Sequence, residues 1–251
     1  MHPVLFTLFG HPIHAYFAFL PLALLSAMFL AAWRAPAAGI PREPFMSMEI
    51  AIFVAALVGS RVAFILEVPA YYAAHPGEML NVLNLGGVSF FGGLVFGAGA
   101  GLAYIAWAGL PLGRVCDLSA PYIALGHAVG KVGCFLHGCC YGKPTDVSWG
   151  MCFPNFSGDT LPRHPAQLYE MAGLIALFFA LCALRRLDVA AGTVMGAYLI
   201  GYGALRFALE YSRDASQTGP AYLGLFRYQW ASAIAMAGGA ALVARVRAVR
   251  G

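Results

Sequence analysis

Seven apolar segments, each about as long as a bilayer is thick when helical, fill most of the chain and leave short connections between them. We place them near residues 15–33, 48–66, 88–108, 117–137, 166–184, 191–211 and 226–246. A membrane-spanning helix needs about 20 mainly apolar residues, because its backbone groups must bond within the segment. Only 10% of the residues are charged. The sequence predicts an all-α membrane protein with seven transmembrane helices, organised as a single integral membrane domain over residues 1–251.

The basic residues of the connections predict the orientation, because Lys and Arg in short loops stay on the cytoplasmic side. One side holds eight arginines: Arg34, Arg42, Arg114, Arg185, Arg186, Arg245, Arg247 and Arg250. The other side holds four basic residues: Lys143, Arg163, Arg213 and Arg227. We therefore expect the amino terminus outside and the carboxyl terminus in the cytoplasm. The net charge of +4 mostly reflects this anchoring, so we expect a membrane and no nucleic acid as partner.

Three further basic residues, Arg61, Lys131 and Arg206, lie inside the second, fourth and sixth predicted spans. All three spans run outward, and each cation lies roughly 20 Å along its helix at 1.5 Å per residue. Buried cations are costly in hydrocarbon, so three at one depth predict a site for a phosphate-like anion in the outer half of the membrane. The alternative is that each side chain reaches the surface separately. Glu210 follows Arg206 by one helical turn, and we expect the two to pair.

More polar side chains are expected at the same outer level. His14 and Tyr16 begin the first span, and the string LPRHPAQLYE at 161–170 leads into the fifth. That string brings Arg163, His164, Gln167, Tyr169 and Glu170. Single Tyr and Arg residues are ordinary interface anchors, so it is their convergence with the buried cations that favours a role in binding.

Several stretches resemble the signatures of the bacterial prolipoprotein diacylglyceryl transferases. They are GKVGCFLHGCCYGKPTDVSWGMCFP, RHPAQLYE and YLIGYGALRFALEYSRD, with HAY, GSRVAFIL, VSFFGG and DLSAPYIALGHAVG in the expected order. The resemblance covers nearly the whole chain. It implies an enzyme of the bacterial inner (cytoplasmic) membrane that moves the diacylglyceryl group of phosphatidylglycerol to the lipobox cysteine of a prolipoprotein. Glycerol phosphate would be released at a site toward the outer leaflet.

The resemblance also assigns candidate site residues. Arg206 and Glu210 match the family's essential pair, Tyr16 a tyrosine of the lipid site, and Gly142 a signature glycine. The predicted catalytic residues are Lys131, Arg206, Glu210, Cys139 and His137. The predicted substrate-binding residues are Arg61, His14, Tyr16, Cys134, Gly142, Arg163, His164 and Tyr169.

The sequence departs from the family pattern in its signature regions. Lys131 stands where the family has arginine, Cys134 and His137 where it has asparagines, and Cys139 where it has glutamate. Lysine keeps the charge but loses the two-pronged grip of a guanidinium on phosphate. Phe91 occupies the place of the histidine in the SFHGG motif and offers no proton chemistry. His127 lies on the same helix face as Lys131, about one turn deeper.

The cysteines on the predicted outer side leave several interpretations open. Cys152 can form a disulfide with Cys139 or Cys140. Cys134, His137, Cys139 and Cys140 can hold a metal ion, although their spacing is tighter than the usual zinc pattern. Nearby cations can make Cys139 a thiolate that accepts the lipid group, and simple packing is the last interpretation. We assign no metal and no cofactor.

The leading hypothesis is therefore a transferase that uses phosphatidylglycerol or a related glycerophospholipid, with a prolipoprotein cysteine as a possible acceptor. One alternative is a paralogue whose acceptor or chemistry has changed through the Cys and His cluster. Another is a lipid-binding membrane protein without turnover, which the phenylalanine at position 91 favours. A thiol redox protein using Cys139 and Cys140 is the least favoured, because adjacent cysteines form a bridge only with a distorted backbone.

Overall fold

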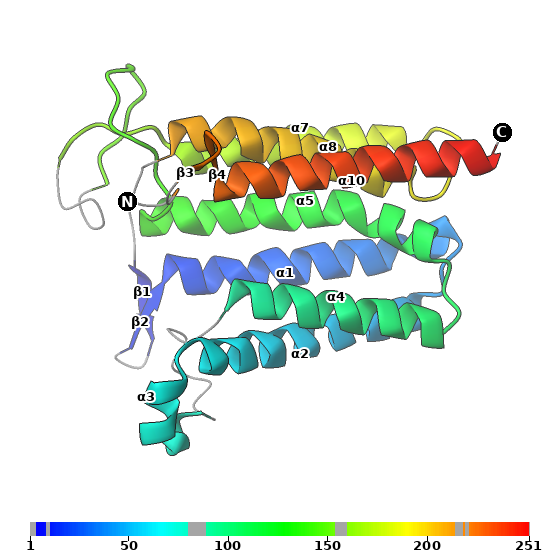
Figure 1. Ribbon diagram of the computed structural model, residues 1–251, viewed down its shortest axis with the longest axis horizontal. Coiled ribbons are helices and arrows are strands. Elements are labelled where there is room, and N and C mark those ends of the chain that lie inside the picture. The colour runs from blue at the N-terminus through cyan, green and yellow to red at the C-terminus, as the bar shows by residue number, and fades with distance from the viewer. Residues whose placement is uncertain are drawn as a thin grey trace. The chain divides into compact units, whose positions relative to one another are not determined.

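The computed structural model describes residues 4–8, 11–79, 89–153, 160–213, 218 and 221–250. Seven long helices dominate this part of the chain, and Figure 1 shows them as ribbons. They are α1 (Ala15–Arg34), α2 (Arg42–Glu67), α4 (Phe90–Trp107), α5 (Leu112–His137), α7 (Ala166–Leu184), α8 (Thr193–Leu209) and α10 (Arg227–Arg250). Each coincides with one of the seven apolar segments, and their ends differ from the prediction by at most six residues. The predicted helical fold is confirmed.

Three of these helices are long and apolar enough to cross a membrane by length and composition: Arg42–Glu67, Ala166–Leu184 and Arg227–Ala248. Ala18–Arg34 and Phe91–Trp107 are shorter apolar helices. Helix α5 is long but carries Asp117, His127 and Lys131, and α8 has 17 residues and carries Arg206. These polar side chains lower the hydropathy of α5 and α8, and several of them are candidate site residues. The fold is that of a helical membrane protein.

Short elements occupy the connections. Two antiparallel strands, β1 (Val4–Leu8) and β2 (His11–His14), precede α1, and β3 (Ala221–Tyr222) pairs with β4 (Leu225–Phe226) before α10. The remaining short elements are α3 (Pro69–Ala74) and the 3₁₀ turns η1 (Pro36–Ala38), η2 (Pro76–Glu78) and η3 (Glu210–Ser212). The expectation of an all-α chain therefore needs correction for two small strand pairs. They form in connections where the apolar stretches are too short for a span.

The chain divides into two compact units, residues 32–115 and residues 1–31 with 116–251. In the first unit α2 packs closely against α4. A Cβ atom added to Gly59 would lie 2.3 Å from the Cβ of Phe96. Only glycine allows the two helices to approach this closely, as is common between membrane helices.

The second unit contains most of the candidate site residues. Small side chains of α5 form its core with apolar side chains of α7 and α8: Ala120, Ala124, Ala128, Leu174, Leu181, Val194 and Tyr198. Asp117 of α5 accepts hydrogen bonds from the backbone N–H of Gly192 (2.7 Å) and of Met195 (2.8 Å). Because the first N–H groups of a helix lack partners within it, this carboxylate fixes the start of α8 against α5.

Candidate active site

Glu170 is the centre of an ion-pair network between helices α5 and α7. Its Oε2 atom lies 2.7 Å from Nζ of Lys131 and 3.9 Å from a guanidinium nitrogen of Arg213. Its Oε1 atom lies 3.4 Å from Nε2 of His127. Glu170 is only 2% exposed. A buried carboxylate with these partners holds α5, α7 and the segment after α8 in one arrangement.

Arg206, near the end of α8, and Glu210, the first residue of η3, form a second ion pair one helical turn apart, with 2.5 Å between Nη1 and Oε2. The predicted pairing is confirmed. Glu210 is 1% exposed, and the guanidinium of Arg206 lies 4.8 Å from the ring centroid of Tyr228 on α10. The carboxylate and the aromatic ring together fix the direction of the guanidinium.

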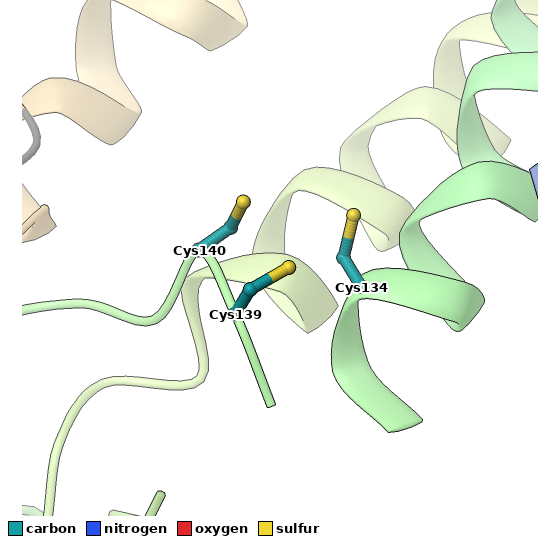
Figure 2. Close-up of side chains that lie close together, drawn as sticks. All are labelled: Cys134, Cys139 and Cys140. Carbon is teal, nitrogen blue, oxygen red and sulfur yellow. The ribbon is translucent and has the colours of Figure 1, made fainter. Parts of the chain in front are cut away.

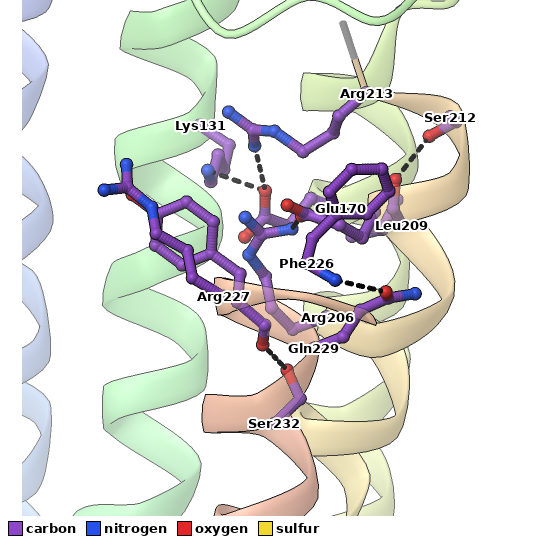
Figure 3. A network of polar contacts seen from close by, with 12 residues as sticks. Lys131, Glu170, Arg206, Leu209, Ser212, Arg213, Phe226, Arg227, Gln229 and Ser232 are labelled. Atoms are coloured by element: carbon purple, nitrogen blue, oxygen red, sulfur yellow. Dashed lines mark hydrogen bonds and ion pairs between the residues drawn. The ribbon is translucent and has the colours of Figure 1, made fainter. Parts of the chain in front are cut away.

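The two ion pairs belong to one polar network (Figure 3). Lys131, Arg206 and Arg213 have side chains that are 11–12% exposed, and they gather around two buried carboxylates. Buried cationic nitrogens donate strong, charge-assisted hydrogen bonds to anions, so this arrangement is suited to an anionic ligand.

The network also contains hydrogen-bonding capacity that protein groups do not use. Among the described residues, neither Oε1 of Glu210 nor Nε2 of Gln229 has a hydrogen-bond partner, and both are buried. Gln229, at the start of α10, accepts a hydrogen bond from the N–H of Phe226 through its other side-chain atom (3.0 Å). Buried polar groups are normally satisfied, so an acceptor and a donor here suit a polar ligand.

The aromatic residues at the start of α1 lie against the end of α5. The ring centroid of His137 is 6.0 Å from that of His14 and 6.0 Å from that of Tyr16. The two helices approach closely here. A Cβ atom added to Gly133 would lie only 2.7 Å from the Cβ of Phe19. Three of the predicted site residues thus form one contact between α1 and α5.

Cys134, Cys139 and Cys140 bring their sulfur atoms together just after α5 (Figure 2). Hydrogen bonds within this cluster, with Cys134 first, raise the pKa of Cys139 and lower that of Cys140, and Lys131 and Arg213 further lower the latter. No disulfide joins cysteines in the described part of the chain. Cys152 donates its S–H to the carbonyl of Thr160 (3.1 Å), so the proposed bridge to Cys139 or Cys140 is not formed.

The segment after α5 is tied to the segments before α7 and after α8. The N–H of Gly142 donates to the carbonyl of His164 (2.8 Å), and that of Lys143 donates to the carbonyl of Ser212 (2.9 Å). A Cβ on Gly142 would lie 2.3 Å from the oxygen of Ser212. Only glycine fits between these backbones. The junction therefore holds the residue that follows Ser212, which is Arg213 of the ion-pair network.

Arg163, His164 and Tyr169 belong to this junction rather than to the ion-pair network. The guanidinium of Arg163 lies 5.1 Å from the ring centroid of Tyr141. The hydroxyl of Tyr169 accepts a hydrogen bond from Nε1 of Trp149 (2.7 Å) and lies 3.1 Å from Nδ1 of His164. These contacts fold the loop after α5 onto the start of α7.

Arg61 and Phe91 lie in the unit formed by residues 32–115. Arg61 donates to the carbonyls of Met79 (3.1 Å) and Glu78 (2.6 Å), and its guanidinium lies 5.2 Å from the ring centroid of Tyr72. Phe91, at the start of α4, is 67% exposed. The convergence of Arg61 with Lys131 and Arg206 stays a prediction.

The sequence analysis did not place Arg213 or Gln229 at the candidate site. It expected Glu170, which ends the string RHPAQLYE, to converge with the buried cations, but it did not include this residue among the catalytic or substrate-binding residues. Arg213 was assigned to a connection, and Gln229 has no motif around it. Of the signature stretches, only Val88, Pro154 and Asp214 lie outside the described residues.

Fold and site together define a helical membrane protein with a buried, cation-rich polar site. The model of the prolipoprotein diacylglyceryl transferase family matches residues 3–245. A phosphatidylglycerol–prolipoprotein diacylglyceryl transferase of Cupriavidus necator is 40% identical over 195 residues, which is 74% of this chain and 69% of the relative. The enzyme of that name from Vibrio vulnificus is 38% identical over 229 residues, 89% of this chain and 82% of the relative. The chain belongs to the prolipoprotein diacylglyceryl transferase family.

Proposed function

We propose that this protein transfers the diacylglyceryl group of phosphatidylglycerol to a thiol acceptor such as the cysteine of a prolipoprotein. Its relatives carry the name of that reaction at about 40% identity. The structural observation that carries the proposal is the buried group of three cations gathered around two carboxylates. Their nitrogen atoms can donate charge-assisted hydrogen bonds to the phosphate of a phospholipid headgroup.

In the proposed complex, Lys131, Arg206 and Arg213 bind the phosphate. Glu170 and Glu210 are positioning residues, because each holds a cation in place through an ion pair. The buried Oε1 of Glu210 can accept a hydrogen bond from a hydroxyl group of the glycerol headgroup. Binding then gives the unused acceptor of Glu210 a hydrogen-bond partner.

The reaction is a displacement at the glycerol carbon that carries the phosphate ester. The acceptor sulfur forms a C–S bond to this carbon, and the C–O bond to phosphate breaks with its electron pair on the departing glycerol phosphate. The three cations stabilise the charge that develops on the phosphate oxygen. A neutral His127 ring, which lies beside Glu170, is the proposed acceptor of the thiol proton.

The remaining sequence-based assignments stay proposals. Cys139 and His137 were assigned to proton handling or covalent transfer, and Cys134 to binding of the substrate. The other substrate-binding proposals are Arg61, His14, Tyr16, Gly142, Arg163, His164 and Tyr169. Gly142, Arg163, His164 and Tyr169 support the binding site through the loop junction that positions Arg213.

We further infer seven spans in a bacterial inner membrane, with the amino terminus outside and the site toward the outer leaflet. The support is the match between seven helices and seven apolar segments and the distribution of arginines over the connections. A variant that keeps only Cys152, which is exposed, tests this orientation. A membrane-impermeant maleimide should label it in intact spheroplasts, and labelling only after lysis would reverse the topology.

The reaction itself is tested with purified protein, phosphatidylglycerol and a lipobox peptide. We expect release of glycerol phosphate and a diacylglyceryl mass on the peptide, and Lys131→Ala should lower both by at least about 10-fold. Folded wild-type protein that yields neither product would overturn the proposal, and product formation at the wild-type rate in Lys131→Ala would remove Lys131 from the mechanism. Complementation of a strain depleted of its own transferase tests whether prolipoproteins are the acceptors in the cell.

A further inference from the structure

Three thiols form a compact cluster at the end of α5. The sulfur atoms of Cys134, Cys139 and Cys140 all lie within 4.8 Å of one another, and Cys134 is buried while the other two are half-buried. Figure 2 shows the three side chains gathered between the last turn of α5 and the turn that follows it. The ring of His137 packs against His14 and Tyr16. Of the four ligands that the sequence suggested, the structure groups the three cysteines.

The backbone after α5 is shaped to bring these thiols together. Gly138 and Cys140 both have positive φ, 90° and 63°, a conformation that residues other than glycine rarely adopt. The N–H groups of Gly138 and Cys139 both donate to the carbonyl of Cys134 (2.9 and 3.1 Å). These bonds fold the chain back over the helix end, so the side chains at positions 139 and 140 return toward position 134.

A buried side chain from another helix holds this turn. Gln167 of α7, which is 1% exposed, donates its Nε2 to the carbonyl of Cys139 (2.6 Å). Backbone hydrogen bonds to the carbonyl of Cys134 in α5 thus fix the turn from one side, and the side chain of Gln167 in α7 fixes it from the other. The three sulfur atoms are positioned before any ligand binds, and such preorganisation lowers the cost of binding.

A cluster of three thiols is poorly explained by packing or by hydrogen bonding alone. An S–H group is a weak donor and a thiol sulfur a weak acceptor, so the cluster gains little from internal bonds. Thiolate ligands select soft metal ions, among them Cu(I) and Zn(II). Zinc sites are almost always four-coordinate, whereas Cu(I) is stable with three sulfur ligands. Three sulfurs therefore match Cu(I) better than Zn(II).

We propose that Cys134, Cys139 and Cys140 form a three-thiolate binding site for monovalent copper. Three thiolates and one Cu(I) ion carry two negative charges in total. The positive charges of Lys131 and Arg213 act on Cys140 and offset part of this charge. The sulfur atoms already lie within 4.8 Å of one another, so the ligands are grouped before the ion binds.

Titration of the purified full-length chain with chelator-buffered Cu(I), after reduction with a phosphine, tests the site. We expect one Cu(I) per chain, with the ultraviolet charge-transfer band of copper thiolates. Loss of a group that only hydrogen-bonds to a metal ligand weakens metal binding by about 10- to 100-fold. Loss of a sulfur ligand should weaken Cu(I) binding by more than this in each of three variants, Cys134→Ser, Cys139→Ser and Cys140→Ser. Cys152→Ser is the matched control and should bind as the wild type does, because its sulfur bonds to the Thr160 carbonyl instead.

Several results would overturn the proposal. These are unchanged Cu(I) affinity in the three cluster variants, equal weakening in Cys152→Ser, or tighter binding of Zn(II) than of Cu(I) in parallel titrations. A disulfide in the purified protein, with no Cu(I) binding after its reduction, would do the same. If a serine variant fails to fold, X-ray absorption on the Cu(I)-loaded wild type decides. Three sulfur neighbours support the site, and a nitrogen or oxygen neighbour contradicts it.

Discussion

Lys131 of α5 and Glu170 of α7 form an ion pair, with 2.7 Å between Nζ and Oε2, and the carboxylate side chain is only 3% exposed. The resemblance described in the sequence analysis implies arginine at the position of this lysine. The same carboxylate also contacts Arg213 and His127. This glutamate therefore holds most of the proposed phosphate-binding groups together, a positioning role that the sequence analysis did not assign to it.

Replacing Glu170 by glutamine should both destabilise the protein and reduce its activity. The change leaves Lys131 and Arg213 buried without their shared carboxylate, which costs about 3 kcal/mol. At about 2–4 °C per kcal/mol for a chain of this size, Tm should fall by roughly 6–12 °C. Thermal unfolding in detergent and glycerol phosphate release measure the two effects.

Glu43→Gln is the control for this change, because Glu43 is exposed in the first turn of α2. It should alter neither Tm nor release. A Glu170→Gln protein as stable and as active as the wild type would show that the network contributes nothing to either property.

Lys131→Arg, which introduces the arginine that the resemblance implies at this position, should preserve product release and lower KM. The guanidinium keeps the charge and adds a second parallel hydrogen bond to the phosphate. Lys131→Met should instead lose one charge-assisted hydrogen bond, about 1.5–3 kcal/mol or roughly 10- to 150-fold in kcat/KM. Steady-state kinetics on mixed micelles of phosphatidylglycerol measure both.

Lys143→Met serves as the control, because Lys143 is exposed on the loop after α5. It should leave kcat/KM unchanged. If Lys131→Met matches the wild type, the phosphate is bound without Lys131.

Gly142→Ala should disrupt the junction between the loop after α5 and the segment after α8. The added Cβ would lie 2.3 Å from the oxygen of Ser212 and 2.7 Å from Cβ of His164. Because the nearest atom is backbone, the segments must move apart, at a cost of about 1–3 kcal/mol. Activity should fall as well, since Arg213 directly follows Ser212. Tm and release rate are measured together.

Gly99→Ala provides the comparison for Gly142→Ala. Gly99 lies within α4, and a Cβ there would meet no atom within 4 Å. In a helix interior alanine is favoured over glycine by about 0.5–1 kcal/mol, so this variant should be at least as stable as the wild type. Equal Tm values for both alanine variants would contradict the tight fit at position 142.

The helices were predictable from the sequence because hydrocarbon thickness and backbone hydrogen bonding leave little choice in a membrane. The Arg206–Glu210 pair was predictable for a similar reason, since residues one helical turn apart share a face. Both inferences depend only on local geometry. They needed no knowledge of which helix packs against which.

The contacts of Glu170 were not predictable in this way. Lys131 and Glu170 are far apart in the chain, and their pairing depends on how α5 and α7 pack. The thiol cluster depends on two backbone conformations, at Gly138 and Cys140. Since residues other than glycine rarely adopt positive φ, the conformation of Cys140 could not be inferred from the sequence.

Asp117 offers a test that separates stability from catalysis. Its two carboxylate oxygens accept from the N–H groups of Gly192 and Met195 at the start of α8, and it belongs to no part of the proposed phosphate-binding site. Loss of such a cap costs about 0.5–2 kcal/mol. Asp117→Ala should therefore lower Tm more than Asp117→Asn, which keeps one acceptor oxygen, while kcat/KM per folded molecule stays unchanged. Asp146→Ala, at an exposed loop position, should leave Tm as it is. A fall in kcat/KM without any change in Tm would place Asp117 in the reaction and contradict its role as a helix cap.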